Sequence, residues 1–300
     1  MACDLTNVQR EASLDDIPSL TLHNGNIIPQ LGVGTYQLSP EDAVPIVSAA
    51  VEMGYRHFDT AQLYHNEAAV GKALNEAIKA GLVKREDLFI TTKLNNDFHE
   101  PAEVVRSFDQ SLKDLGLDYV DLFLIHWPVP KLYDGRYDLT WQTMIDRIYE
   151  TEKSKAIGVS NFEIHHLERI IDATGFVPHA NQIQAHPYFA NNELRQFCQS
   201  KEIVVEAWAP LARATVLKDP VVEELSQRFE IAPTDLVLGW ALARGDVIFP
   251  KTSKVARLAE NAHCLTIEMP AEAMAAIDQL DKGEAGRYGD HPDKVDFLGR

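Results

Sequence analysis

Two residues that could move a proton stand close together in this chain, a carboxylate at Asp59 and a phenol at Tyr64. The run Tyr55–Phe58 is typical of a short buried strand, so Asp59 stands where that strand should end and Tyr64 follows in the loop. An acid at a strand end with a tyrosine close behind it indicates proton chemistry. Taken alone, the pair is explained equally well by a turn-forming aspartate and an aromatic residue at a rim.

The other predicted strands also end in polar or aromatic side chains. These are Lys93, His126, Ser160 with Asn161, Gln182, Trp208 and Lys251. A single lysine of this kind is usually a solvated charge, and a single histidine is usually a satisfied core residue. Repeated at strand after strand, the pattern favours a functional site, provided that the strand ends meet.

These residue types limit the chemistry. A tyrosine is a weak acid at neutral pH unless a cation stabilises its phenolate, and Lys93 with Asp59 as its charge partner would do so. His126 could donate a hydrogen bond to a carbonyl. Acyl transfer is disfavoured because no G-x-S-x-G elbow is present. Zinc is disfavoured because there is no H-E-x-x-H, and His165 and His166 have no carboxylate complement in the sequence.

A hydride donor would supply the attack that this set lacks. There is no G-x-G-x-x-G, since Gly32-Val33-Gly34 continues as Thr35-Tyr36-Gln37, so a Rossmann half is unsupported. The stretch Pro250–Arg257 instead gathers lysines, an arginine and hydroxyls where the last strand ends and a helix should open. In an acidic protein this predicts an anion site, although a solvated charge run is the alternative.

Strand-like and helix-like segments alternate along most of the chain. The predicted strands are Gln30–Tyr36, Tyr55–Asp59, Leu88–Lys93, Tyr119–His126, Ala156–Ser160, Ala180–Gln184, Ile203–Trp208 and Val247–Pro250. Helical patterns separate them, for instance Val104–Leu115, Ile164–Thr174 and Thr234–Ala243. Eight such units in 300 residues predict an α/β fold, a (β/α)8 TIM barrel, whose strand ends meet at one catalytic mouth.

The ends of the chain depart from this alternation. We expect residues 1–18 to form a flexible tail and residues 19–300 to form a single barrel domain. The domain should begin with a hairpin whose primed turn is at Asn24-Gly25. Ser39 should cap the first barrel helix. Pro220–Phe229 and Ala271–Leu280 predict extra helices near the C-terminus, and 281–300 a loop across the mouth.

Composition excludes several classes of function. Hydrophobic residues are 45% and charged residues 24%, which supports a large core. A net charge of −17 disfavours nucleic acid and anionic membranes as partners. Three separated cysteines, no long apolar run and no signal peptide predict a soluble cytoplasmic protein.

Taken together, these segments closely resemble the aldo-keto reductase family. The stretch Gly54–Glu67 matches its G-x-R-x-F-D-T-A-x-x-Y-x-N-E signature. Other motifs follow in order at Ile90–Leu94, Leu124–Pro128, Gly158–Phe162, Asn181-Gln182 with His186-Pro187, and Pro250–Asn261. The ending Gly286-Arg287 with His291–Asp296, and the tryptophan at Trp208, are most similar to the microbial branch that contains 2,5-diketogluconate reductase.

Carried over residue by residue, the resemblance implies a catalytic tetrad of Asp59, Tyr64, Lys93 and His126. Tyr64 would be the general acid, assisted by Lys93, itself paired with Asp59, and His126 would orient the carbonyl. The implied activity is NADPH-dependent reduction of aldehydes and ketones by hydride transfer, without a metal. The resemblance also implies a monomer.

The resemblance further implies where NADPH and substrate bind. Ser160, Asn161 and Gln182 would hold the nicotinamide carboxamide, and Trp208 would stack on the ring. Lys251, Thr252, Lys254 and Arg257 would bind the 2′-phosphate, and Glu260 and Asn261 would contact the adenine side. Gly34, Thr35, Asp59, Pro210, Leu211 and Ser253 complete the cofactor set. Tyr36, Tyr64, Asn95, His126 and Trp127 would form the substrate pocket.

The sequence departs from the family pattern at a few positions. Asn95 stands where that branch usually has tryptophan, so one aromatic wall of the pocket should be missing. Gln184 replaces a glutamate, and Thr151-Glu152-Lys153 lacks the glycine usual before the fifth strand. Two alternatives remain open, a cofactor-binding or structural module on the same fold and a metal-dependent barrel hydrolase. NADPH oxidation with simple aldehydes would distinguish the first, and sensitivity to a chelator the second.

Overall fold

Eight parallel strands form the centre of the molecule. The structure is a computed structural model that describes Leu14 and residues 17–298. The sheet follows the order of the sequence from β3 to β10. Its strands are β3 Val33–Gly34, β4 His57–Asp59, β5 Phe89–Leu94, β6 Leu122–Ile125, β7 Ile157–Ser160, β8 Ala180–Gln184, β9 Val204–Trp208 and β10 Val247–Ile248.

The sheet closes on itself just before β3. Leu31 pairs with Ile248 in parallel. The Gly32 N–H donates to Ile248 O at 3.0 Å, and the Ile248 N–H donates to Gln30 O at 2.7 Å. The first and last strands are thereby joined, and the predicted (β/α)8 barrel is confirmed.

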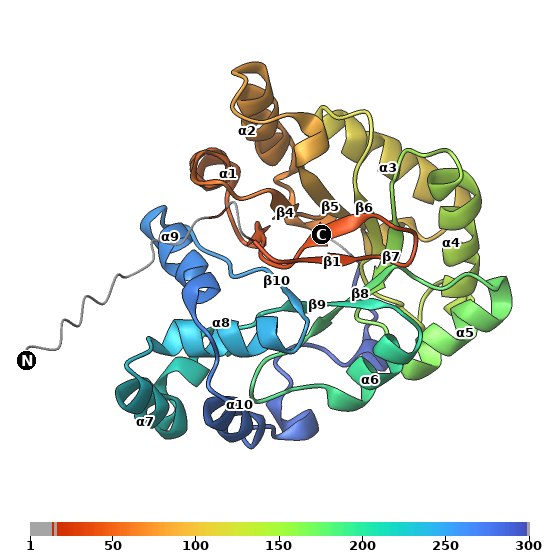
Figure 1. Cartoon of the computed structure of the whole chain (residues 1–300). Helices are drawn as coiled ribbons and strands as arrows, with labels where there is room; N and C mark the ends of the chain where they lie inside the picture. Colours follow the sequence, from red (N-terminus) through yellow and green to blue (C-terminus); the bar gives the residue numbers. More distant parts are fainter. Residues whose placement is uncertain (1–13, 15–16, 299–300) are drawn as a thin grey trace, which may run out of the picture.

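Helices surround the barrel (Figure 1). They are α1 Pro40–Met53, α2 Glu67–Lys79, α3 Pro101–Leu115, α4 Tyr137–Met144, α5 Ile164–Thr174, α6 Asn192–Ser200, α7 Pro220–Phe229, α8 Pro233–Ala243, α9 Ala256–Ala262 and α10 Ala271–Asp278. Ser39 caps α1 as predicted, because its Oγ accepts from the Asp42 N–H at 3.1 Å. Among the described residues, no helix is both long enough and apolar enough to cross a membrane.

The predicted elements are largely present, and their ends are shorter or shifted. Tyr55 precedes β4 because its N–H bonds to Ala50 O and ends helix α1. β10 ends at Ile248 rather than at Pro250, which has no N–H to give to a ladder. Helix α3 begins at Pro101, three residues before the predicted start at Val104, since proline suits the first helical position.

A two-stranded hairpin, β1 Ser19–Thr21 and β2 Ile27–Pro29, lies across the amino-terminal end of the barrel (Figure 1). The predicted primed turn is wrong. The Gly25 N–H bonds to Leu22 O at 2.8 Å. Gly25 alone is left-handed in this turn, with φ 89°. Asn24 instead uses its side chain to reach Lys155 O at 3.0 Å, which anchors the hairpin to the barrel.

The two chain ends lie differently with respect to the barrel. Most of the predicted tail, residues 1–18, lies outside the described residues, but Leu14 and Ile17 pack against the core. After α10 the chain returns to the carboxyl-terminal strand ends. There the Tyr288 N–H bonds to Gln184 Oε1 at 3.2 Å, and Asn96 Nδ2 bonds to Phe297 O at 3.1 Å.

Candidate active site

The predicted polar residues lie at or next to the carboxyl-terminal ends of the strands. Asp59 ends β4, Lys93 is the next-to-last residue of β5, and His126 follows β6. Asp59 is in register with Thr91, and Lys93 with Leu124. Ser160 ends β7 beside Gln182 of β8, and Trp208 ends β9. Because these strands are parallel, the side chains that alternate inward converge on the barrel mouth.

Lys93 is the centre of the group. It is fully buried, and its Nζ lies 2.7 Å and 2.8 Å from the two Asp59 carboxylate oxygens. The same nitrogen donates to Thr60 O at 3.0 Å and to the Tyr64 hydroxyl oxygen at 3.2 Å. Since the Tyr64 oxygen accepts from Lys93, its own hydrogen is left to point elsewhere.

The pKa of the Lys93 ammonium is raised above its usual range. Burial alone would lower it, but the Asp59 carboxylate, together with Tyr64, outweighs the loss of hydration. Burial raises the pKa of Tyr64 to about 12, although the Lys93 charge acts in the opposite direction. The lysine therefore favours the phenolate, as expected from the sequence, without overcoming the burial of the phenol.

His126 faces Tyr64, with 5.7 Å between the ring centroids. Burial, and then the Lys93 charge, lower the pKa of His126 well below its ordinary value, so the imidazole is neutral. Its Nδ1 is buried without a partner. The remaining nitrogen, Nε2, is therefore the one that could offer a hydrogen to a ligand in the mouth.

An amide cluster lies beside His126. Asn161 Nδ2 donates to His126 O at 2.9 Å and to Ser160 Oγ at 3.0 Å. The Trp208 indole N–H donates to Asn161 Oδ1 at 2.9 Å. Gln182 Nε2 donates to Asp59 Oδ1 at 2.8 Å. The predicted nicotinamide contacts are thus brought together and joined directly to the tetrad.

The predicted phosphate segment follows β10. Thr252 closes a tight turn, because its Oγ1 accepts from the Lys254 N–H at 2.9 Å. Lys251, Ser253, Lys254 and Arg257 are exposed, and no ion pair within the described part of the chain involves these cations. Helix α9 begins at Ala256, so Lys251 and Lys254 precede it and Arg257 lies in its first turn. Glu260 is exposed on α9, and Asn261 is buried.

The remaining predicted cofactor residues follow or belong to β3 and β9. The Thr35 N–H and Oγ1 each donate to Asp59 O at 3.0 Å, and Gly34 pairs with Asp59 in the ladder. Pro210 is buried and Leu211 half-buried, just after β9. Tyr36 is 53% exposed, with its ring centroid 5.1 Å from that of Tyr64.

Asn95 and Trp127 follow β5 and β6. Asn95 extends the register of Leu94 with Ile125 by one residue, which sets it beside His126. It is buried, and its Oδ1 has no hydrogen-bond partner. The Trp127 ring is half-buried, with its centroid 6.1 Å from that of Phe297.

Sequence reasoning missed Phe297 at this mouth and Glu206 in the barrel interior next to it. Phe297 is distant in sequence, and no local pattern marks it. Glu206 is fully buried on β9 and accepts from Gln182 Nε2 at 3.1 Å. A charged residue inside the apolar run Val204–Trp208 was the signal that could have found it.

His165 and His166 have a carboxylate partner in the structure, so the prediction that they lack one is wrong. Asp293 lies 2.8 Å from His165 Nε2 and 3.0 Å from His166 Nε2. These three form the one candidate metal group among the described residues. However, His166 Nδ1 accepts from the Glu163 N–H at 3.1 Å, so its Nε2 carries the hydrogen and donates to Asp293. The group is better explained as a clasp between α5 and the C-terminal segment.

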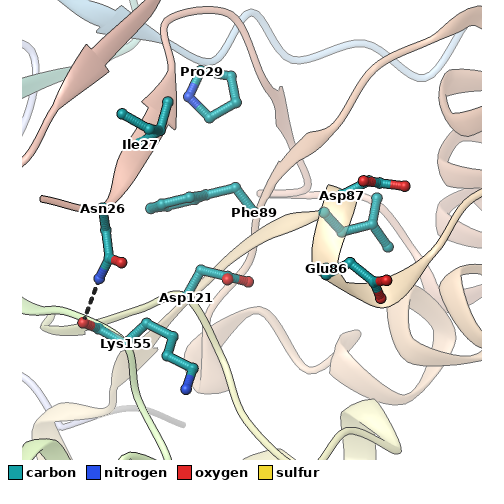
Figure 2. A pocket seen from close by; sticks show the side chains of 9 residues that line it. Asn26, Ile27, Pro29, Glu86, Asp87, Phe89, Asp121 and Lys155 are labelled. Carbon is teal, nitrogen blue, oxygen red and sulfur yellow. Dashed lines mark hydrogen bonds between the residues drawn. The ribbon is translucent and has the colours of Figure 1, made fainter.

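A pocket of about 330 Å³ lies at the opposite end of the barrel (Figure 2). It is lined by residues of the hairpin and of the strand beginnings, among them Asn26, Phe89, Asp121 and Lys155. Asp121 is already paired with Arg85 at 2.8 Å. No predicted site residue lines this pocket, so it does not belong to the mouth.

Known proteins are similar in sequence to this chain over most of its length. Methylglyoxal reductase DkgA of Escherichia coli K12 is 41% identical over 278 residues, covering 92% of this chain and 97% of that protein. The uncharacterized oxidoreductase YtbE of Bacillus subtilis is 40% identical over 278 residues, with the same coverage of 92% and 97%.

Solved structures are similar throughout the barrel. A mutant of Gox0644 in complex with NADPH has a TM-score of 0.87 and 37% identity, covering 93% of this chain and 99% of that one. The Bombyx mori aldo-keto reductase AKR2E4 in complex with NADP has a TM-score of 0.85 and 34% identity, covering 94% and 98%. Residues 30–282 match the sequence profile of the aldo/keto reductase family, and the chain belongs to that family.

Proposed function

We propose that this protein reduces aldehydes and ketones to alcohols with NADPH, using Tyr64 as the general acid and no metal. The observation that carries the proposal is the position of Lys93. Its Nζ contacts the Asp59 carboxylate at 2.7 Å and the Tyr64 oxygen at 3.2 Å. A charged lysine held in this way lowers the cost of forming a phenolate.

When bound, NADPH would supply the hydride that forms the new C–H bond at the carbonyl carbon as the carbonyl π-bond breaks. Tyr64 gives its hydroxyl proton to the oxygen on which negative charge develops. The phenolate left on Tyr64 is stabilised by the Lys93 ammonium, and Asp59 keeps that lysine charged. Neutral His126 donates from Nε2 to the same oxygen and orients it.

The chain's residues fit the cofactor in two places. Gln182 Oε1 receives no hydrogen bond from a described residue, so it is available to the carboxamide N–H. Lys251, Lys254 and Arg257 are exposed cations after the last strand, and they suit the 2′-phosphate that distinguishes NADPH from NADH. The NADPH and NADP complexes of Gox0644 and AKR2E4 support this choice of cofactor.

Small aldehydes and dicarbonyl compounds form the proposed substrate class. The similarity to methylglyoxal reductase DkgA supports this class. So does the polar residue Asn95 at the mouth, which leaves the pocket without one bulky aromatic wall. We place the enzyme in the cytoplasm as a monomer, and the two buried free thiols, Cys198 and Cys264, suit a reducing compartment. Sedimentation and cell fractionation measure both points.

The test is the substitution Tyr64→Phe. We expect the rate of NADPH oxidation with methylglyoxal to fall by at least about a hundredfold, the usual contribution of a positioned acid. NADPH binding should be retained. Tyr119→Phe is the matched control, because Tyr119 lies under Arg85 at the other end of the barrel. Unchanged turnover in Tyr64→Phe would exclude Tyr64 as the acid, and loss of activity with a chelator would exclude the metal-free mechanism.

A further inference from the structure

Glu206 is a buried carboxyl group of the barrel interior that the reaction described above does not use. It lies on β9, where its register partners are Gln182 of β8 and Val247 of β10. It precedes Trp208 by two residues, so both side chains point to the same side of the sheet. None of its surface is exposed, and its Oε1 has no partner.

Glu206 and Asp59 together occupy the amide nitrogen of Gln182. The distances from Gln182 Nε2 are 2.8 Å to Asp59 Oδ1 and 3.1 Å to Glu206 Oε2. An amide nitrogen has two hydrogens, so both are used. The reversed amide would set its oxygen against the Asp59 carboxylate, which can only accept, and would leave the carbonyl oxygen of Glu206 without its donor. The arrangement therefore determines that Gln182 presents Oε1, rather than Nε2, to a ligand.

The surroundings of Glu206 favour its neutral form. Asp59 and the neutral His57 face the interior from β4, Lys93 faces it from β5, and Val247 of β10 is apolar. One ammonium is present, and Asp59 already holds it at 2.7 Å. Burial, and then the Asp59 charge, raise the pKa of Glu206 to about 8.

We propose that Glu206 is a positioning residue of this active site: as a neutral acid it holds the Gln182 amide with Oε1 toward the cofactor, without adding a second negative charge beside Asp59. This inference rests on the proposed function. It assigns no proton transfer to Glu206, which acts through Gln182 and through the charge of the tetrad.

The proposal has two consequences. Removing the Glu206 acceptor lets the Gln182 amide rotate, and this weakens binding of the nicotinamide carboxamide. Ionising Glu206 leaves the acceptor in place but adds a charge near Asp59 and Lys93. That charge opposes formation of the Tyr64 phenolate, so the hydride-transfer rate should fall as pH rises through about 8.

The first experiment measures NADPH binding without any carbonyl substrate, by fluorescence titration near pH 6. Glu206→Leu removes the acceptor, and we expect the Kd to rise about five- to tenfold, as for the loss of one buried hydrogen bond. Glu206→Gln keeps an acceptor and should bind within about twofold of the unaltered protein. Infrared difference spectra between the unaltered protein and Glu206→Gln should show a protonated carboxylic acid that disappears as pH rises through about 8.

The second experiment measures single-turnover hydride transfer as a function of pH. The unaltered protein should lose about tenfold or more in rate above the Glu206 pKa, and Glu206→Gln should not. Glu67→Gln is the matched control. Glu67 is also buried, and its pKa is raised by burial to about 7. It bonds to Thr92 and Ser111 rather than to Gln182, so its loss should leave the alkaline decline intact.

The proposal is overturned if Glu206→Gln keeps the alkaline decline, or if Glu206→Leu folds and binds NADPH with unchanged affinity. Should Glu206→Leu fail to fold, Glu206→Gln, the infrared band and the pH profile still decide. Failure of the proposed function looks different, since the unaltered protein itself would then not bind NADPH or oxidise it with any carbonyl compound.

Discussion

Lys93 is a buried cation, and one carboxylate offsets most of the cost of its burial. The pair has 0% and 6% of its side-chain surfaces exposed. Burying an ammonium alone would shift it to the neutral amine, which could not stabilise a phenolate. Asp59 is itself oriented by Gln182 and by the Thr35 bonds to its carbonyl. The positive charge of Lys93 beside Tyr64 is thus maintained by residues from four strands or strand ends.

Replacing Asp59 by asparagine should therefore cost more than a hydrogen bond. We expect Asp59→Asn to lower the free energy of unfolding by about 3–5 kcal/mol, the usual effect of leaving one partner of a buried pair uncompensated. Urea denaturation monitored by fluorescence measures this loss.

The control for this prediction is Asp109→Asn. Asp109 pairs with Lys153 at 2.7 Å, but the two side chains are 50% and 45% exposed. Exposed pairs contribute about 0–1 kcal/mol, so this variant should denature almost like the unaltered protein. Equal losses in the two variants would contradict the special role of the buried pair.

At the scale of elements, the connection between α4 and β7 contains a strained backbone conformation where the sequence lacks the glycine usual in the family. The helix α4 continues into a π-helical turn, Ile145–Tyr149. Glu152 then adopts a left-handed conformation with φ 60°. It belongs to the stretch Thr151-Glu152-Lys153, which lacks the glycine usual in the family. A side chain in this region is disfavoured because its Cβ crowds the following carbonyl.

Glu152→Gly should relieve that strain. We expect an increase of about 0.5–1 kcal/mol in the free energy of unfolding, with unchanged turnover, because Glu152 is exposed and distant from the tetrad. Thermal unfolding measures it. Glu150 has an ordinary helical φ of −65°, so Glu150→Gly should destabilise the protein instead. The same direction of change in both variants would refute the argument.

At the scale of the whole molecule, the barrel has neither a free sheet edge nor an uncovered amino-terminal end among the described residues. The Leu31–Ile248 bridge joins the first and last strands, and the hairpin covers the amino-terminal end. Beneath the hairpin lies an apolar cluster that includes Leu22, Ile28 and Phe249. His57 is fully buried beside this cluster, with its ring against Phe89 and Phe249.

Four buried histidines, from both ends of the barrel strands, predict how stability depends on pH. Burial lowers the pKa of His57 and His99 to about 3, and of His179 and His186 to about 4. The folded protein then binds fewer protons than the unfolded chain below about pH 6.5, so their contribution is complete above that pH. It is lost as pH falls through the folded-state pKa values. Glu67 acts in the opposite direction, since its raised pKa favours the folded state at low pH.

With His126 and His166, six histidines have lowered pKa values, against five carboxyl groups with raised values, Glu67, Asp121, Glu206, Asp235 and Asp246. We therefore expect the free energy of unfolding to fall between about pH 6.5 and pH 4. Urea denaturation at several pH values, with proton uptake on unfolding measured by calorimetry, checks the sign. His99→Gln, at a buried histidine whose Nε2 has no partner, should flatten the slope. A stability that rises on acidification would contradict the prediction.

The sequence by itself determined the order of the elements and the position of the site at the carboxyl-terminal ends of the strands. Alternation within parallel strands is local, so Asp59, Lys93, His126 and Gln182 could be assigned to strand ends from the runs that precede them. The resemblance to the aldo-keto reductases rested on the same short motifs. Strand limits were less accurate, because ladder bonds such as that between Ile248 and Gln30 depend on a distant partner.

Only the tertiary structure decided which residues outside these motifs meet the site. Asp293 contacts His165 across 128 positions, and Gln182 contacts Glu206 across 24. Such contacts follow from the curvature of the closed barrel and the return of the C-terminal segment, which no local pattern encodes. Charge is another example. The sequence shows a glutamate at 206, but only the tertiary structure buries it near Asp59, and burial and then the Asp59 charge raise its pKa to about 8.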